Sequence, residues 1–189
     1  PHAMAALLRG GELRIDGFIC PGHVSVIIGS QAYEFICRDF GTPCVVTGFE
    51  GADMLAGIAM LLRQLAESRA EVEIQYTRTV RREGNARARD FMNEVFEESD
   101  ETWRGLGLIP RSGLAIRSRF AEHDAAVRFN DMAVPVPVEP KGCAGGDVLR
   151  GSKTPRECPL FRKTCTPDHP VGACMVSGEG TCAAYYRYE

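Results

Sequence analysis

The 189-residue sequence lacks the features that would direct a protein to a membrane, to nucleic acid or to a nucleotide. Its longest apolar runs, such as residues 56–62, are far shorter than the roughly 20 residues that a helix needs to cross a bilayer. The net charge of −3 gives no overall attraction to nucleic acid. The arginines within residues 78–89 have no aromatic side chains between them, which favours a solvated surface. No glycine-containing segment matches a phosphate-binding loop.

The beginning of the sequence contains no segment that resembles a signal or transit peptide. Its first residue is Pro1 rather than methionine. We therefore expect a cytoplasmic protein without a membrane anchor, and we expect the sequence to be a piece of a longer chain.

The eight cysteines are unevenly distributed. Three of them, Cys20, Cys37 and Cys44, lie among apolar residues in the first quarter of the chain, where we interpret them as small core residues. No cysteine lies between Cys44 and residue 143. The other five form a cysteine-rich tail: Cys143, Cys158, Cys165, Cys174 and Cys182. This distribution predicts two regions with different chemistry.

The first region alternates between strand-like and helix-like patterns. Strands are predicted at residues 12–19, 43–49 and 103–110, and helices at residues 30–41, 52–70, 86–96 and 114–129. Such alternation is typical of an α/β fold with an open, mostly parallel sheet and flanking helices. The prolines of residues 132–140 would end this α/β domain near residue 131, and residues 132–189 would form a small, cysteine-rich C-terminal domain.

Three kinds of structure could account for the cysteine-rich tail. A disulfide framework is disfavoured because no export signal is present and the tail contains an odd number of cysteines, five. Zinc sites usually contain a C-x2-C pair, and the tail has none. Fourteen residues separate Cys143 from Cys158, six separate Cys158 from Cys165, and sixteen separate Cys165 from Cys182. A [4Fe–4S] cluster can take thiolates from separate loops, but spacing alone leaves cluster and zinc almost equally favoured.

Two polar residues follow the first two predicted strands. His23 belongs to the segment PGHVS, and Glu50 belongs to TGFEGAD, which also contains Asp53. Parallel strands would bring these segments to the same edge of the sheet, where α/β proteins commonly bind ligands. A histidine with carboxylates could serve proton transfer or metal binding. Equally, His23 could satisfy backbone groups of a turn, and Asp53 could simply favour the start of a helix.

Seven segments occur in an order that resembles the C-terminal half of the HypD family of [NiFe] hydrogenase maturation proteins. They are GFICPGHVSVIIG, PCVVTGFEGAD, QYTR, GLGLIPRSGL, ECPLF, CTPDHPVGACMVS and EGTCAAYYRY. The resemblance extends over essentially the whole sequence. It implies that the tail is an iron–sulfur domain in which Cys143, Cys158, Cys165 and Cys182 bind a [4Fe–4S] cluster, whereas Cys174 stays apart from it.

The resemblance also implies a function. The family provides the scaffold on which the Fe(CN)2CO group of [NiFe] hydrogenases is assembled. Its partners are a HypC-type chaperone, a HypE-type cyanide donor and, indirectly, the hydrogenase large subunit. His23 and Glu50 would line the assembly cleft. The family's redox-active and iron-binding cysteines lie in motifs of the types CGxHxH and GPGCPVC, which this sequence lacks.

Two departures from the family pattern concern residues near these sites. GFEGAD replaces the usual GFEPLD, so the turn after Glu50 loses a proline. CAGGD replaces the usual CRCGE, so Gly145 stands where the family commonly has a cysteine. Two rival functions stay open: a zinc-stabilised protein-interaction module, and a hydrolase using His23, Glu50 and Asp53, although the latter leaves the tail without a role.

Overall fold

The computed structural model describes residues 1–10, 13–132 and 138–189. The first half is built on a parallel sheet in the order β1-β2-β3. Its strands are β1 (Phe18–Pro21), β2 (Cys44–Thr47) and β3 (Val72–Ile74). The sequence predicts a strand at residues 12–19, but residues 13–17 are irregular and the strand begins at Phe18. Glu12 lies outside the described residues. The predicted α/β class with a parallel sheet is confirmed for this part of the chain.

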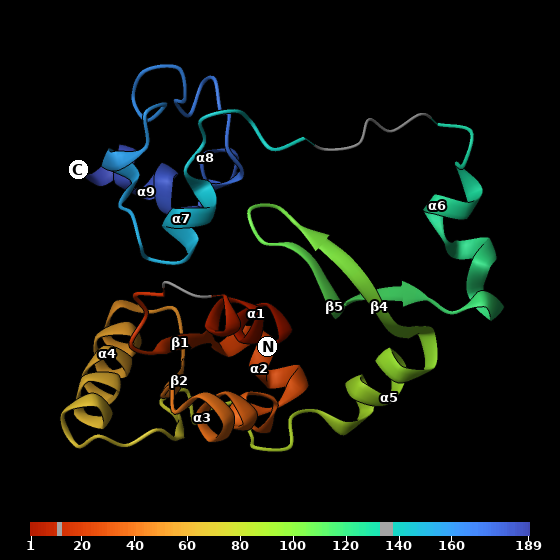
Figure 1. Cartoon of the computed structure of the whole chain (residues 1–189). Coiled ribbons are helices and arrows are strands. Elements are labelled where there is room, and N and C mark those ends of the chain that lie inside the picture. The colour runs from red at the N-terminus through yellow and green to blue at the C-terminus, as the bar shows by residue number, and fades with distance from the viewer. Residues whose placement is uncertain (11–12, 133–137) are drawn as a thin grey trace.

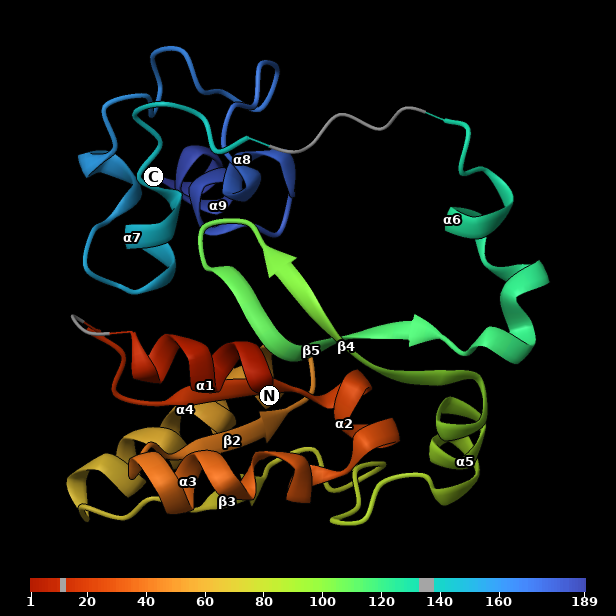
Figure 2. The ribbon, with the colours of Figure 1, turned by 45° about the vertical axis from the view of Figure 1, so that its right-hand side comes forward.

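Helices cover both faces of this sheet (Figures 1 and 2). They are α1 (His2–Arg9), α2 (Gly22–Ile28), the 3-10 helix η1 (Ser30–Tyr33), α3 (Glu34–Phe40) and α4 (Gly51–Ala66). Alternate residues of β2 serve the two faces: Cys44 and Val46 pack with the core beneath α3, whereas Thr47 and Val45 face Gly57 of α4. The predicted helix at 30–41 is confirmed, and Gly41 ends it in the left-handed conformation that glycine tolerates (φ 62°).

An antiparallel hairpin follows the sheet. After α5 (Ala86–Val95), strand β4 (Phe96–Trp103) pairs with β5 (Gly107–Ile116). The prediction of one strand over residues 103–110 is therefore wrong, because these residues form the turn and the start of β5. The helix predicted at 114–129 is also wrong at its start: β5 continues to Ile116, and only the short helices η2 (Ser118–His123) and α6 (Ala125–Arg128) follow.

The cysteine-rich tail is a separate group of short elements above the hairpin (Figure 1). These elements are α7 (Gly145–Leu149), the 3-10 helix η3 (Pro155–Glu157), α8 (Ala173–Val176) and α9 (Thr181–Tyr188). The predicted boundary between residues 131 and 132 is followed by residues 133–137, which lie outside the described residues, and the two-domain division stays a prediction.

The hairpin tip meets the tail through glycines. Gly105, at φ +80°, lies so close to Gly146 of α7 that a Cβ on Gly146 would come within 2.9 Å of the Gly105 oxygen. The Gly105 N–H donates to Glu139 Oε1 at 2.7 Å, and Arg150 Nη2 donates to the Gly105 oxygen at 3.5 Å. The contact between the hairpin and the tail is therefore made by backbone groups, and the side chains of Glu139 and Arg150 stabilise it through hydrogen bonds.

Candidate metal centre and sheet edge

Three thiols of the tail share one small apolar core. Cys158, Cys165 and Cys182 are each at most 9% exposed and pack with Phe161 and Met175. Cys158 follows η3, Cys165 lies in a tight turn that pairs it with Phe161, and Cys182 lies in the first turn of α9. Segments that are distant in the sequence thus bring three of the four predicted ligands together.

Cys143 completes this group from the side of α7. It is only half-buried, and its Sγ lies where a Cβ on Gly172 would approach within 2.6 Å. Burial raises the pKa of the Cys143 thiol, and the proximity of Cys158 and Cys165 raises it further. Cys143 therefore lies near two of the other predicted ligands.

Cys182 shows the same effect more strongly. Burial, together with the neighbouring Cys174, Cys158, Cys143 and Cys165, raises the pKa of Cys182 to about 12. Buried thiols that do not ionise readily in the absence of metal are stabilised as thiolates when a cation binds among them.

Cys174 was expected to stay apart, and that expectation is wrong. Its side chain packs against the same core and lies near Cys182 and Cys143. The reason is local: α8 immediately precedes α9 and packs on it, so Cys174 on α8 is held next to Cys182 on α9. Burial raises the pKa of Cys174. Five thiols, rather than four, gather in this part of the chain.

Local backbone features shape the loops that carry these thiols. Before Cys158, Thr154 and Glu157 form a capping box in which the Thr154 N–H donates to Glu157 Oε2 at 2.7 Å. The Val171 N–H donates to Cys165 Sγ at 3.4 Å, so a backbone dipole points at this sulfur. Across the described ranges, no three His, Cys, Asp or Glu side chains are placed to hold one metal ion.

A cavity gives access to one of these thiols. It has a volume of about 870 Å³ and lies between the hairpin tip and the tail. The residues that line it include Trp103 and Arg104 of the hairpin and Glu139, Cys143 and Asp147 of the tail. Of the predicted ligands, Cys143 is thus the one that borders this solvent-filled space.

The ends of β1 and β2 lie side by side, as predicted, with Pro21 paired to Thr47. His23 lies in the first turn of α2 rather than in a loop, and Glu50 is the N-cap residue of α4. Both side chains are exposed. The ring of Phe49 lies 5.0 Å from that of His23, so the two segments touch at this edge. A ligand-binding role for His23 and Glu50 stays a prediction.

Asp53 is engaged elsewhere. It is buried, and it accepts hydrogen bonds from Gln75 Nε2 at 2.9 Å and from Arg78 Nη2 at 2.6 Å. Hydrogen bonds from Arg78 and Gln75 hold the pKa of Asp53 below its usual range. Gln75 Oε1 also accepts the Gly48 N–H at 3.3 Å, which ties the loop of Glu50 to the end of β3. Because Asp53 pairs with arginine, the geometry gives no support to a hydrolase built on His23 and Asp53.

Sequence reasoning missed Gln75 and Arg78 as parts of this edge. Arg78 also lies over the Tyr76 ring at 4.8 Å, and a Cβ on Gly22 would approach Tyr76 Cδ1 within 2.7 Å. The available signal was the segment QYTR, which follows β3 in the chain. The strand itself is only three residues long and contains Glu73, so its pattern did not identify it.

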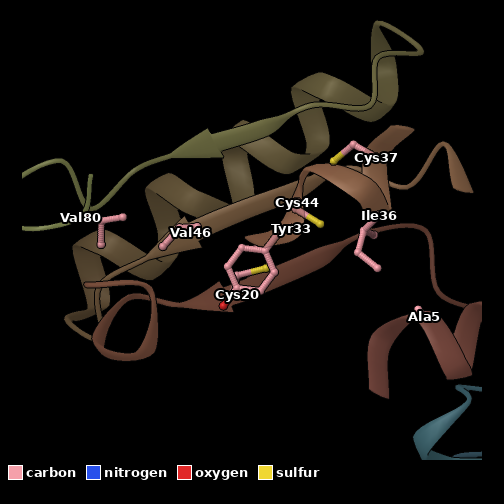
Figure 3. Close-up of a cluster of buried hydrophobic side chains, with 8 residues drawn as sticks. All are labelled: Ala5, Cys20, Tyr33, Ile36, Cys37, Cys44, Val46 and Val80. Atoms are coloured by element: carbon pink, nitrogen blue, oxygen red, sulfur yellow. The ribbon is translucent and has the colours of Figure 1, made fainter. Parts of the chain in front are cut away.

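The three cysteines of the first quarter form a separate buried group (Figure 3). Cys20 on β1, Cys44 on β2 and Cys37 on α3 are at most 9% exposed, which confirms their interpretation as core residues. The hydrogen bond with Cys20 is the main cause that raises the pKa of Cys44 to about 12, and contact with Cys44 raises the pKa of Cys37. Cys37 and Cys44 are therefore neutral packing groups, and Cys20 is buried beside them.

Comparison with known sequences connects these features to a family. The family model described as "HypD: Hydrogenase formation hypA family" matches residues 1–189. The chain belongs to the HypD family. It is 51% identical over 195 residues to the hydrogenase maturation factor HypD of Azotobacter vinelandii and 47% identical over the same length to that of Cupriavidus necator. A HypD of Rhodobacter capsulatus is 45% identical over 195 residues.

Each of these HypD alignments covers 100% of this chain but only 51% of the relative. The chain therefore spans about half the length of the curated relatives that it matches. Within the part of the chain that the structure describes, no helix is both long and apolar enough to cross a membrane.

Proposed function

We propose that this chain is the cluster-binding part of a hydrogenase maturation factor, with a [4Fe–4S] cluster held by Cys143, Cys158, Cys165 and Cys182. The observation that carries the proposal is that Cys158, Cys165 and Cys182 pack from separate segments into one apolar core, with Cys143 near Cys158 and Cys165. Their spacing is that of the family the chain resembles. A bound cluster would supply one-electron transfer at this position.

The residues present fit such a cluster. Iron–sulfur clusters are bound by four cysteine thiolates and are tuned by hydrogen bonds to sulfur and by burial. Here three of the four sulfurs are buried, and Cys165 Sγ accepts a backbone N–H. Gly172 leaves room beside Cys143 that a side chain would fill. The role of these residues is to bind the cluster, to limit its contact with water and to leave one side accessible near Cys143.

The zinc-stabilised alternative is less well supported. A structural zinc ion requires four ligands around a single centre, with sulfur at about 2.3 Å. In the described part of the chain, no three potential ligands are arranged around one such point. A cubane cluster binds each thiolate at a different iron, so its ligands lie farther from one another than those of a single ion. The gaps of fourteen, six and sixteen residues between successive predicted ligands, which the family shares, favour the cluster.

We also propose that the whole protein acts as the scaffold for the Fe(CN)2CO group, which is cargo rather than a resident cofactor. A HypC-type chaperone and a HypE-type cyanide donor would be its partners, and the hydrogenase large subunit would receive the product. His23 and Glu50, at the joined ends of β1 and β2, would line the assembly site. The family's iron-binding motifs are absent from this chain, so we expect it not to carry the Fe(CN)2CO group alone.

Anaerobic reconstitution with iron and sulfide tests the cluster. We expect brown protein with about four iron atoms per chain, as the cluster composition requires. Cys158→Ala should abolish the colour, and Cys174→Ala, the matched control, should leave it nearly unchanged. Stoichiometric zinc binding without an iron chromophore would instead support the interaction module. Infrared bands of metal-bound CO and cyanide on the 189-residue chain alone would contradict the proposed need for the rest of the family's chain.

A further inference from the structure

Helix α4 buries two polar residues and leaves several large apolar residues exposed on its outer side. Asp53 and Gln64 are 4% and 0% exposed and, with Gly57, are the residues that α4 buries. In contrast, Leu55 is 70% exposed and Leu62 is 60% exposed. A helix on the surface of a soluble domain normally has one apolar stripe, which faces the core, whereas α4 has apolar residues on its outer side as well.

The exposed apolar residues of α4 form a continuous stripe. They are Leu55, Ile58, Leu62 and Leu65, which are 70%, 40%, 60% and 37% exposed. Their spacing of three, four and three residues places them on one side of the helix, in the pattern that receives a second helix. At 1.5 Å per residue the stripe is about 15 Å long.

The surroundings of the stripe indicate a permanent partner. Ala59 and Ala66 lie beside it and would allow a helix to approach closely. Of the two charged residues of α4, Asp53 is buried, which leaves Arg63 as the exposed one. Obligate interfaces resemble a hydrophobic core divided in two, whereas surfaces that partners leave and rejoin keep more polar groups.

We propose that the α4 stripe is the packing face for a helix from the half of the HypD-family chain that these 189 residues do not include. The aligned relatives are about twice as long as this chain, so a covalently linked partner of suitable size exists in the family. In Figures 1 and 2, none of the other helices and strands of the described residues covers the outer face of α4.

The stripe is continuous with the sheet edge. Phe49, 67% exposed, directly precedes Glu50 at the start of α4 and lies against His23. A half-chain that packs on Leu55 and Phe49 would therefore also border His23 and Glu50. This last step rests on the proposed function, whereas the packing of α4 does not.

Hydrogen exchange measured by mass spectrometry tests the packing. The samples are the 189-residue chain alone and the same chain joined in one polypeptide to the complementary half of the Azotobacter vinelandii relative. We expect amides of residues 55–65 to exchange at least 10-fold more slowly in the joined protein. Equal exchange rates in the two proteins would overturn the proposal.

Variants give a second, independent measurement with the two halves expressed as separate chains. Leu55→Lys combined with Leu62→Lys should weaken their association about 100-fold, because two leucines would lose their burial. Ala56→Lys, which adds one charge on the exposed flank of α4, should leave it nearly unchanged. Undiminished association of the double variant would overturn the proposal, as would a stable homodimer of the 189-residue chain that the double variant abolishes. Cluster reconstitution should be unaffected in all variants, so failure of the cluster assignment would be recognised separately.

Discussion

Replacing Gly57 by alanine tests how closely α4 lies on the sheet. A Cβ at this position would overlap Cγ2 of Thr47, a residue that is 2% exposed and cannot move outward into solvent. Alanine in the middle of a helix gains about 1 kcal/mol over glycine from helix propensity. Overpacking of a buried contact costs about 1–3 kcal/mol, and direct overlap belongs at the upper end of that range.

The difference predicts that Gly57→Ala destabilises the protein by about 2 kcal/mol, even though it improves helix propensity. For a chain of this size, thermal unfolding should then occur about 4–8 °C lower. Differential scanning calorimetry and urea unfolding followed by circular dichroism provide the two measurements. Since Glu50 is the N-cap residue of α4, the same change should also displace the loop that carries Glu50 and Phe49.

Two controls separate the overlap from other effects. A Cβ added to Gly51, at the first position of the same helix, would meet no atom within 4 Å, so Gly51→Ala should leave stability equal or higher. Thr47→Ser removes Cγ2 but retains the hydroxyl that contacts Met54 Sδ at 3.4 Å. In the Thr47→Ser background, Gly57→Ala should therefore cost less. A stabilising Gly57→Ala, or a cost that Thr47→Ser does not reduce, would refute the reasoning.

Two further predictions concern ionisable groups. The pKa of Asp53 is lowered by Arg78 and Gln75, so this carboxylate contributes stability above its unfolded pKa of about 3.9, and the contribution is lost as pH falls through the lower folded pKa. Urea unfolding should therefore show a large deficit of Arg78→Met at pH 7 and a smaller one at pH 3; equal deficits would contradict the assignment. The raised pKa of Cys182, about 12, predicts that in the metal-free protein iodoacetamide labels this residue more slowly at pH 8 than an unburied thiol does. Fragment-ion mass spectrometry can follow that labelling, and rapid modification would show that the thiol is not held as described.

The sequence predicted the sheet edge better than it predicted the helix packed beside it. Pro21 pairs with Thr47 at the ends of two short β-branched or apolar runs, each of which is followed by a turn. Runs of this kind are readily identified as buried strands. In α4, apolar residues occur on most sides, so the pattern identified a helix but not which side meets the sheet. Gly57 and Gln64 determine which side of α4 meets the sheet. Gly57 allows the helix to approach Thr47 closely, and Gln64 Oε1 accepts the Glu71 N–H at 2.8 Å.

The hairpin and Cys174 show two further limits of sequence patterns. Strand β4, FEESDETW, is mostly exposed, so it lacks the alternation that a half-buried strand requires. The family resemblance sets Cys174 apart from the predicted ligands, but a sequence pattern describes separation along the chain and not distance in space. Packing of α8 on α9 placed it among the other thiols.

The contact between Gly105 and Gly146 has a consequence for modularity. Since peptide groups form this contact, the distance between the hairpin and the tail is determined by backbone geometry and not by the size of a side chain at either glycine. Surface residues of the hairpin, such as Glu101 and Arg104, can therefore be exchanged or labelled without altering how far the hairpin lies from the tail. The tail could in this way keep one placement while the chemistry of the neighbouring cavity wall is changed.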